Sequence, residues 1–524
     1  MNQRKAGVIL SYLSIGANSI IQLVYIPMLL YYLTKDQYGI YQLMGSLVAY
    51  LAIMDFGLSN TTTRYLSQAY AKQDTTRAQT IISTSHSLYL AIAALLVLLG
   101  IIFYFLITPI YGNTLSPADL LTAKHIFLIM LLNIAVVIPS NIFTATINAH
   151  EQFVFSRGLG LIKVLLQPLL VWGILAWKAS VLNLVLAQTG FNFLVIFFNY
   201  IYCKRKLHIS FPLNFTNKPL MKELTGFSVF VFFHAIMDQI YWRLGQLVLG
   251  AVSGAVVVAN YAIALQLTAF VISLPTAMSG VFLPQLSALV TKAGNLHDIN
   301  AIFCKMGRLQ FMLMMLLLIG FIFLGKTFIT LWVGSSYAIC YYVALILMTA
   351  YILDVSQNIG IPILQALKKH AFRAYVYVAM AALNIALCIP LAKHYGEIGC
   401  AVATAICLML GSGLAINWYY AHIGLDLKNF FINLARITVG IMPAVGLILC
   451  VFYLFPMQNT WISLIEHGIV ITLIYALSSW VLVLNPYEKQ LFYGPLKTIL
   501  LKLHKMKKNF QRMLEGYDFM NWGG

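Results

Sequence analysis

Two ionisable side chains lie inside one long apolar stretch, residues 227–250, which carries Asp238 and Arg243 near or just past its middle. The stretch is long enough to cross a bilayer as a helix. Each charged side chain costs about 2.5–3.5 kcal/mol at the centre of such a helix, so both are unfavourable unless they face other helices or water. A spacing of five residues turns the two side chains about 140° apart, so each faces a different neighbour. They are either contacts between helices or the lining of a polar passage, and we expect the passage.

Further polar side chains interrupt other apolar stretches. Lys163 lies about a turn and a half inside the stretch 158–177, where it either faces a cavity or extends toward the membrane surface. Asn18 and Gln22 share one helical face, and Asp354 shares a face with Asn358. Single Asn and Gln residues often join helices. Polar faces on several helices are nevertheless what a shared hydrated cavity requires, so these residues are candidates for its lining.

The residue types that would mark an enzyme are not arranged for catalysis. The seven cysteines have no metal or redox spacing, and the sequence holds no acid pair, nucleophile–base set, metal cluster or phosphate-cradling glycine loop. The longest predicted outer loop, about residues 107–120, offers one acid, Asp119. The sequence therefore predicts no enzyme, no cofactor and no metal site.

The composition identifies the elements that must position these residues. Of 524 residues, 61% are hydrophobic and 9% are charged, and the mean hydropathy is +0.85. Soluble globular proteins are usually about 25% charged. The chain is therefore expected to be an all-α, polytopic membrane protein with about fourteen transmembrane helices. They are expected at 7–33, 39–57, 81–107, 121–145, 158–177, 180–202, 227–250, 255–281, 308–325, 337–362, 374–392, 397–420, 433–455 and 461–484.

The net charge of +18 comes from short loops between these helices, which argues against nucleic acid as a partner. Of the 33 Lys and Arg residues, Lys163 and Arg243 lie within helices and five lie in one set of alternating loops; the rest lie in the other set and in the C-terminal tail. The positive-inside rule then places both termini in the cytoplasm. The basic tail is expected either to lie on anionic lipid as an amphipathic helix or to be a solvated end.

An internal repeat suggests how the helices are grouped. A shift of 220 residues lays the first predicted helix on the seventh, so that Asn18 coincides with Asp238 and Tyr41 with Tyr261. We expect two six-helix halves around a central cleft, at 1–210 and 211–425. Two additional transmembrane helices follow at 426–484, and a basic cytoplasmic tail at 485–524.

Several short segments, in this order and at these topological positions, resemble a known family. The second helix ends in Asp55-Phe56-Gly57-Leu58, with Arg64-Tyr65 following. This resembles the corresponding segment of bacterial polysaccharide-repeat flippases, whose superfamily also holds multidrug and toxin extruders and lipid II flippases. Three further segments are similar to loops and turns of that family: Ala149-His150-Glu151-Gln152-Phe153, Phe282-Leu283-Pro284-Gln285-Leu286-Ser287 and Leu331-Trp332-Val333-Gly334.

The resemblance implies that the protein moves an undecaprenyl-pyrophosphate-linked oligosaccharide from the cytoplasmic to the outer leaflet by alternating access. Cationic side chains would bind the pyrophosphate, and amide and aromatic side chains would bind the sugars. Carboxylates would bind a coupling proton or sodium ion. The candidates are Arg243, Lys163 and Arg64 for pyrophosphate; Asn18, Gln22 and Trp242 for sugar; and Asp238, Asp354 and Asp55 for the ion. Other polysaccharide assembly proteins are implied as partners besides the lipid-linked oligosaccharide and the bilayer. The resemblance also implies the bacterial plasma membrane as the location of the protein.

Other interpretations remain open at this point. Asp55 followed by Gly57 is also the pattern of a plain helix end, and Arg64 could be a positive-inside anchor. The functional alternative is that Arg64 lines the cytoplasmic mouth of the cleft and that Asp55 orients it. A cation-coupled multidrug antiporter would share the fold, but it should use acidic cavity residues without buried cations. A polytopic polysaccharide polymerase would be expected to carry catalytic residues on a long outer loop, and the predicted outer loops of this sequence are short.

Overall fold

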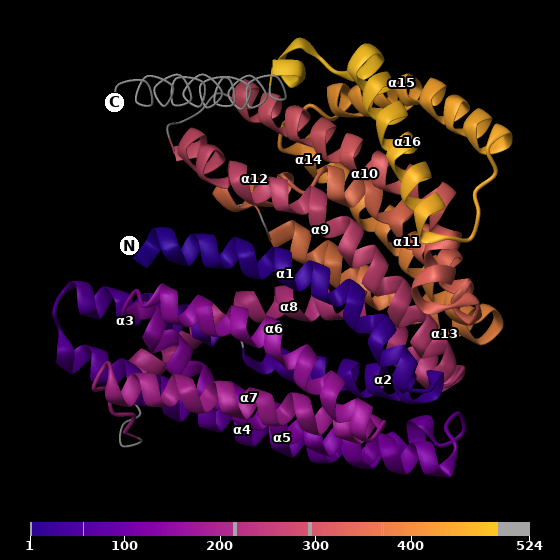
Figure 1. Ribbon diagram of the computed structural model, residues 1–524. Coiled ribbons are helices and arrows are strands. Elements are labelled where there is room, and N and C mark those ends of the chain that lie inside the picture. Colours follow the sequence, from indigo (N-terminus) through magenta and orange to yellow (C-terminus); the bar gives the residue numbers. More distant parts are fainter. Residues whose placement is uncertain are drawn as a thin grey trace, which may run out of the picture.

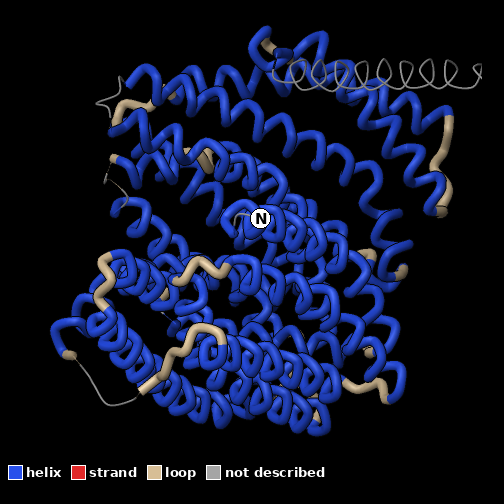
Figure 2. The backbone as a smooth tube through the Cα atoms, turned by 60° about the vertical axis from the view of Figure 1, so that its left-hand side comes forward, coloured by secondary structure: helices blue, strands red, loops and turns tan. Residues whose placement is uncertain are grey.

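The computed structural model describes residues 3–55, 57–212, 217–291, 296–367, 369 and 371–490. Side chains are described throughout these ranges except at 4, 5, 8, 225–238, 278–291, 366 and 371. Every regular element within these ranges is a helix (Figure 2). The predicted all-α class is therefore confirmed.

Sixteen α-helices and four short 3-10 or π-helical segments follow one another along the described chain. Their bounds are α1 Gln3–Tyr32, α2 Lys35–Ala52, η1 Ile53–Asp55, α3 Leu58–Ala71, α4 Thr75–Tyr111, α5 Pro117–Ala149, α6 Phe153–Trp177, α7 Val181–Arg205, α8 Lys218–Val252, α9 Ala255–Thr291, α10 Leu296–Val333, η2 Ser335–Tyr337, α11 Ile339–Ser356, α12 Gly360–Ala366, α13 Ala371–Leu408, η3 Met409–Ala415, α14 Ile416–His422, α15 Leu427–Leu454, α16 Trp461–Ser478 and η4 Ser479–Val483.

Twelve segments of the described chain are long and apolar enough to cross a membrane. One of them, Phe372–His422, has 51 residues, which as one straight helix would be about 76 Å long, far more than a bilayer needs. A further predicted span, 227–250, lies in α8, whose side chains are described only in part. The protein is thus a multi-pass membrane protein of about the predicted number of spans.

The 51-residue segment is in fact a hairpin that reverses at Gly396, where φ is 55° and ψ is −134°. Cys388 Sγ lies 2.7 Å from Cys400 Sγ, although residues twelve apart on a straight helix are separated by about 18 Å. Asn384 Nδ2 similarly donates to Thr404 Oγ1 at 3.5 Å. The two spans predicted at 374–392 and 397–420 are therefore separate and antiparallel.

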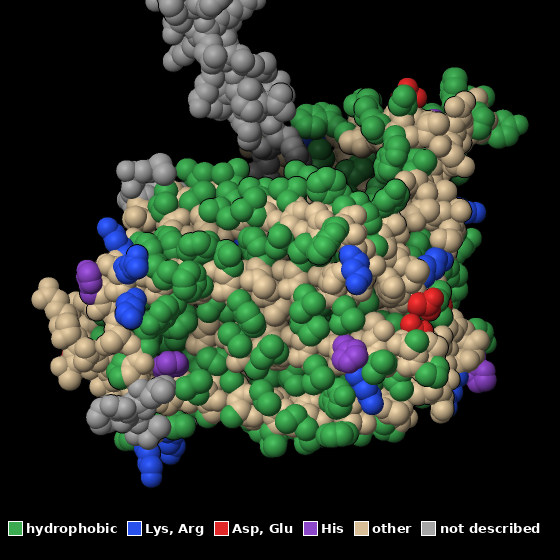
Figure 3. Space-filling view, turned by 60° about the horizontal axis from the view of Figure 1, so that its bottom comes forward, with side chains coloured by type: hydrophobic (Ala, Val, Ile, Leu, Met, Phe, Trp, Pro, Cys, Tyr) green, Lys and Arg blue, Asp and Glu red, His purple; other side chains and the backbone are tan. Residues whose placement is uncertain are grey.

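The helices fall into two groups in space. In Figure 1 helices α2 to α7 lie in the lower part of the molecule and α9 to α16 in the upper part, with α1 along their boundary. The predicted domain boundaries at 210, 425 and 484 stay predictions. Hydrophobic side chains run across the middle of the face shown in Figure 3, and Lys and Arg side chains lie toward its ends.

Contacts between loops agree with the predicted alternation of sides. At the predicted inner end, Val154 N donates to Gln3 Oε1 at 3.1 Å, and Asn300 Nδ2 donates to Gly424 O at 3.2 Å. At the predicted outer end, Lys35 Nζ donates to Ser336 O at 2.7 Å. Each bond joins two loops predicted to share a side. Which end faces the cytoplasm stays a prediction, and the tail from residue 491 on lies outside the described residues.

The two groups meet closely at the predicted outer end. A Cβ atom on Gly39 of α2 would lie 1.9 Å from Ala255 O of α9, so this contact is backbone against backbone. Trp332 Nε1 donates to Leu23 O at 2.6 Å, which joins α10 to α1. At the predicted inner end, Tyr65 on α3 lies close to Glu223 on α8. The outer contact is the one in which backbones touch.

Candidate functional site

Arg243 lies on α8, half-buried, and faces tyrosines of α2. Tyr38, Tyr41 and Tyr50 are all close enough to interact electrostatically with its guanidinium. Tyr50 OH also donates to Gln239 O at 3.2 Å, which places this ring against α8 one turn before Arg243. Among the described side chains, no carboxylate lies within ion-pair distance of Arg243. The guanidinium is therefore a cation whose described electrostatic neighbours are tyrosines.

Hydroxyl and amide groups extend this environment to two more helices. Tyr41 OH donates to Gln188 Oε1 of α7 at 3.2 Å, and Gln188 Nε2 donates to Tyr25 OH of α1 at 3.0 Å. Gln42 Nε2 donates to Tyr38 OH at 2.7 Å. These residues form a polar layer in the first group of helices. Sequence reasoning missed the tyrosines, whose signal is the spacing of Tyr38, Tyr41 and Gln42 on α2.

Two amide contacts join the groups of helices beside this layer. Ser46 of α2 donates to the side-chain carbonyl of Gln246 on α8. Gln266 of α9 donates to the side-chain carbonyl of Gln22 on α1. Gln22 thus joins two helices, which was the alternative to a substrate-binding role. Asn18, one turn earlier on α1, is exposed.

The other predicted cations lie on different helices. Lys163 is half-buried on α6, and no described side chain forms an ion pair or hydrogen bond with it. Arg64 is exposed on α3, next to the Tyr65–Glu223 contact. No single described contact brings Arg243, Lys163 and Arg64 together. The side chain of Asp238 lies outside the described residues.

Asp55 is held at a break in the chain. It ends the 3-10 segment η1, and Gly57, with φ 66°, precedes α3. The backbone therefore has a helix end at this motif, as the simpler interpretation expects. The carboxylate is half-buried and accepts a hydrogen bond from Asn141 Nδ2 of α5 at 3.1 Å. Asp55 is therefore a carboxylate inside the first group of helices, with an amide as its described partner.

Asp354 belongs to a buried ionic cluster that the sequence did not reveal. Its Oδ1 accepts from Ser412 Oγ at 2.6 Å and lies 4.0 Å from an Arg373 guanidinium nitrogen. Arg373, 8% exposed, also donates to Tyr420 OH at 3.2 Å and to Tyr377 OH. Arg373 was predicted to be a basic loop residue. The available signal was Tyr377, four residues later on the same helical face.

A small polar cavity of about 120 Å³ borders this cluster, between α8, α9, α11 and α13. Trp242 and Tyr351 are stacked at one wall, with ring centroids 5.5 Å apart and planes 11° from parallel. Asp354, Asn358 and Tyr377 also line the cavity. Trp242, predicted to contact sugar, therefore faces the second group of helices, while Arg243 next to it faces the first.

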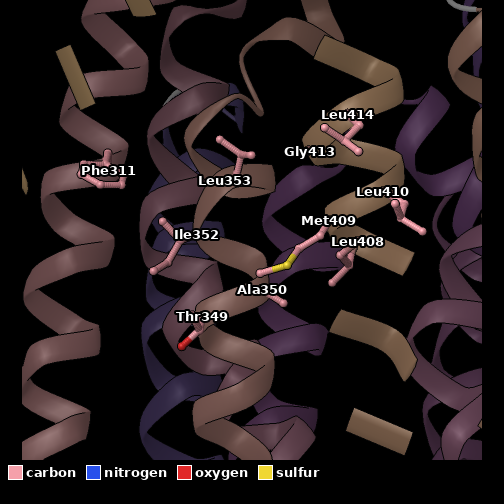
Figure 4. A pocket seen from close by; sticks show the side chains of 10 residues that line it. All are labelled: Phe311, Thr349, Ala350, Ile352, Leu353, Leu408, Met409, Leu410, Gly413 and Leu414. Atoms are coloured by element: carbon pink, nitrogen blue, oxygen red, sulfur yellow. The ribbon is translucent and has the colours of Figure 1, made fainter. Parts of the chain in front are cut away.

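A larger cavity, about 520 Å³, lies on the opposite face of α11 (Figure 4). It is lined by aliphatic and aromatic side chains of α10 and α11 and by residues 408–414. Among the residues that line this cavity, Thr349 is the one with a side-chain hydroxyl. Because its walls are apolar, this cavity suits hydrocarbon rather than sugar or phosphate.

Comparison with known proteins identifies the family. A family model described as polysaccharide biosynthesis protein matches residues 5–290. This chain belongs to that family. A Bacillus subtilis (strain 168) relative, described as the uncharacterized membrane protein EpsK, is 22% identical over 484 residues, which cover 89% of this chain and 92% of the relative. The family predicted from the sequence motifs is confirmed.

Solved structures of transporters share the fold of this chain. A lipid II flippase, MurJ, in an inward closed conformation has a TM-score of 0.66 at 17% identity, covering 93% of this chain and 99% of the flippase. An inward-facing multidrug resistance transporter of the MATE family and MOP superfamily has a TM-score of 0.64 at 12% identity, covering 78% and 94%. These likenesses confirm the predicted fold.

Proposed function

We propose that this protein is a transporter, not an enzyme, and that it moves a lipid-linked oligosaccharide from the cytoplasmic to the outer leaflet. Membership of the polysaccharide biosynthesis family supports a substrate on that route. The fold it shares with a protein named as a lipid II flippase supports the type of movement. The observation that carries the proposal is Arg243, a half-buried cation with no described acidic partner, facing a layer of tyrosines.

The chemistry of such a lipid explains what Arg243 would do. The polyprenyl chain can remain in the bilayer, but the pyrophosphate and the sugars cannot cross hydrocarbon without a large desolvation cost. An arginine offers phosphate a planar fork of N–H donors, and its charge strengthens each hydrogen bond. The hydroxyls of Tyr38, Tyr41 and Tyr50 would supply further donors to phosphate or sugar oxygens. Lys163 and Arg64 are secondary candidates, nearer the predicted inner end.

Alternating access requires the contact between the two groups of helices to open and close. In this conformation α2 and α9 touch at the predicted outer end, so outward release would need Gly39 and Ala255 to separate. We infer that a proton or sodium ion drives the exchange through Asp55. This carboxylate has Asn141 as its described partner, whereas Asp354 already has Arg373 as an internal counter-ion.

The test is complementation of a flippase-deficient strain that makes a known surface polymer. Arg243→Ala and Arg243→Gln should both reduce surface polymer to a few per cent or less, because removing a charged phosphate contact costs about 2–5 kcal/mol. Arg157→Ala is the matched control, since Arg157 is an exposed arginine at the start of α6. Asp55→Asn should remove the dependence of flipping on a proton or sodium gradient in vesicles.

Full restoration of polymer by both Arg243 variants, at equal protein level, would contradict the proposed role of this residue. Drug-resistance profiles of the same strains address the multidrug alternative, which the MATE likeness keeps open. Resistance conferred without any polymer restoration would favour the antiporter.

A further inference from the structure

We propose that the cavity lined by Trp242, Tyr351, Asp354 and Asn358 binds the sugar residue that is joined directly to the pyrophosphate. This inference rests on the proposed function and adds a second subsite to it. It also gives Asp354 a different role from ion coupling. The cavity lies on a different side of α8 from the tyrosines near Arg243.

The carboxylate of Asp354 is prepared to accept hydrogen bonds. Its Oδ1 is held by Ser412 Oγ, and its charge is offset by Arg373. No described residue donates to its Oδ2, and 24% of the side chain is exposed. A half-buried carboxylate oxygen that faces a cavity can accept hydrogen bonds, and sugar hydroxyls donate them as short, charge-assisted bonds. An inorganic cation is disfavoured there because Arg373 already balances the charge.

The aromatic wall suits the other side of a sugar ring. Trp242 and Tyr351 are held nearly parallel, and Tyr377 is packed edge-on against Tyr241, 5.9 Å between centroids. Small-ligand sites typically combine apolar and aromatic walls with a few placed polar groups. Here the polar groups are Asp354, near the end of α11, and the amide of Asn358, in the turn that follows; the face that these residues were predicted to share is broken because α11 ends at Ser356.

The size of the cavity limits what fits. Its volume is about 120 Å³. That is the scale of part or all of one sugar ring, not of an oligosaccharide. The apolar cavity across α11 offers one side-chain hydroxyl, Thr349, and so cannot read the pattern of a sugar.

The backbone of α8 links this cavity to the proposed phosphate site. Trp242 and Arg243 are consecutive, so their Cα atoms are about 3.8 Å apart and their side chains diverge by about 100°. A sugar phosphate bound at both sites would have to extend around α8 from the side of Arg243 to the side of Trp242. The two subsites together would be specific for the first sugar, and they would not contact the rest of the oligosaccharide.

Equilibrium binding to the purified full-length protein in detergent tests this inference. The probes are a short polyprenyl pyrophosphate without sugar and the same lipid bearing one glucose, galactose or N-acetylglucosamine. At least one sugar should improve affinity about tenfold, which is about 1.4 kcal/mol. Trp242→Ala, Asp354→Asn and Asn358→Ala should bring that ratio close to one. Thr349→Ala, on the opposite face of α11, is the control and should keep it.

The outcomes separate this inference from the proposed function. Arg243→Ala should weaken binding of the lipids with and without sugar alike. If it weakens the binding of neither, the proposed phosphate site is wrong, whatever the ratio of the affinities with and without sugar. The sugar subsite is wrong if no sugar improves affinity, or if the cavity variants leave the ratio unchanged. Because Asp354→Asn disturbs Arg373, Asn358→Ala tests the same ratio without touching the ion pair.

Discussion

At the scale of single residues, burial of charge separates two kinds of site. Arg373 and Arg308 are buried and have carboxylate partners, Asp354 and Glu488. Arg243 is half-buried, and no described carboxylate neutralises it. A buried cation without a partner is costly, so it is retained where an anion from outside completes the site. This contrast, more than the presence of arginine itself, is the reason that we propose Arg243 as a position for substrate.

Hydropathy located some of these residues but not their partners. Arg243, Lys163 and Asp354 were predictable because each interrupts an apolar run. The Asp354–Arg373 pair was not, because Arg373 lies near the start of α13, where a basic residue is also what the positive-inside rule expects. Only the packing of α11 against α13 shows that this arginine points inward.

The Arg308–Glu488 pair should be a major stabilising contact of the C-terminal helices. Arg308 Nε donates to Glu488 Oε1 at 2.7 Å, and a second nitrogen donates to Oε2 at 3.0 Å, with both side chains almost fully buried. Arg308 also donates to Asn433 Oδ1 at 3.1 Å, which adds α15 to the contact. Removing one partner of a buried pair costs about 3–5 kcal/mol.

Glu488→Gln should therefore lower the melting temperature of the detergent-solubilised protein by several degrees or more. The control is Asp298→Asn, in an exposed pair with His297 whose side chains are 85% and 58% accessible, and it should change little. Equal melting temperatures for the two variants would show that the buried pair does not hold these helices.

At the scale of elements, helices were easier to predict than their joints. Long apolar runs fixed where each helix lies, since a membrane leaves few alternatives. Two joints were less visible. The reversal at Gly396 was expected as a boundary, but the π-helical segment η3 that follows it was not. The carbonyls of Ser412 and Gly413 accept hydrogen bonds from Asn417 Nδ2, which is local. Ser412 O also accepts from Gln357 Nε2, and this bond depends on the packing of a distant segment against η3.

Two glycines on α2 give an internal comparison of close and open packing. A Cβ on Gly39 would lie 1.9 Å from Ala255 O, whereas a Cβ on Gly45 would meet no atom within 4 Å. Gly39→Ala should separate α2 from α9 at a cost of about 1–3 kcal/mol, as overpacking usually does. Gly45→Ala should be neutral or stabilise by up to about 1 kcal/mol, because alanine favours a helix. Melting temperatures that fall equally in both variants would contradict the close packing of α2 on α9.

At the scale of the whole molecule, the family motifs and the charge bias predicted the architecture, while the site needed the helices to be packed. The polar layer around Arg243 draws on α1, α2, α7 and α8, whose residues are separated by more than two hundred positions between Tyr25 and Gln239. No spacing along the chain links Tyr25 to Gln188. The repeat at 220 residues suggested two halves, but not which faces of them meet.

The closed outer end should be a step of the transport cycle, not a permanent contact. Lys35 Nζ donates to Ser336 O at 2.7 Å, and Lys35 also lies over the ring of Tyr337, 4.3 Å from its centroid. Both contacts cross from α2 to the loop after α10, so they must break if substrate leaves outward. A short bis-methanethiosulfonate reagent joining cysteines in a Lys35→Cys, Ser336→Cys variant should therefore stop flipping in vesicles, and reduction should restore it. Each single variant treated in the same way should remain active. Undiminished flipping by the cross-linked protein would mean that the two groups of helices do not separate at this end.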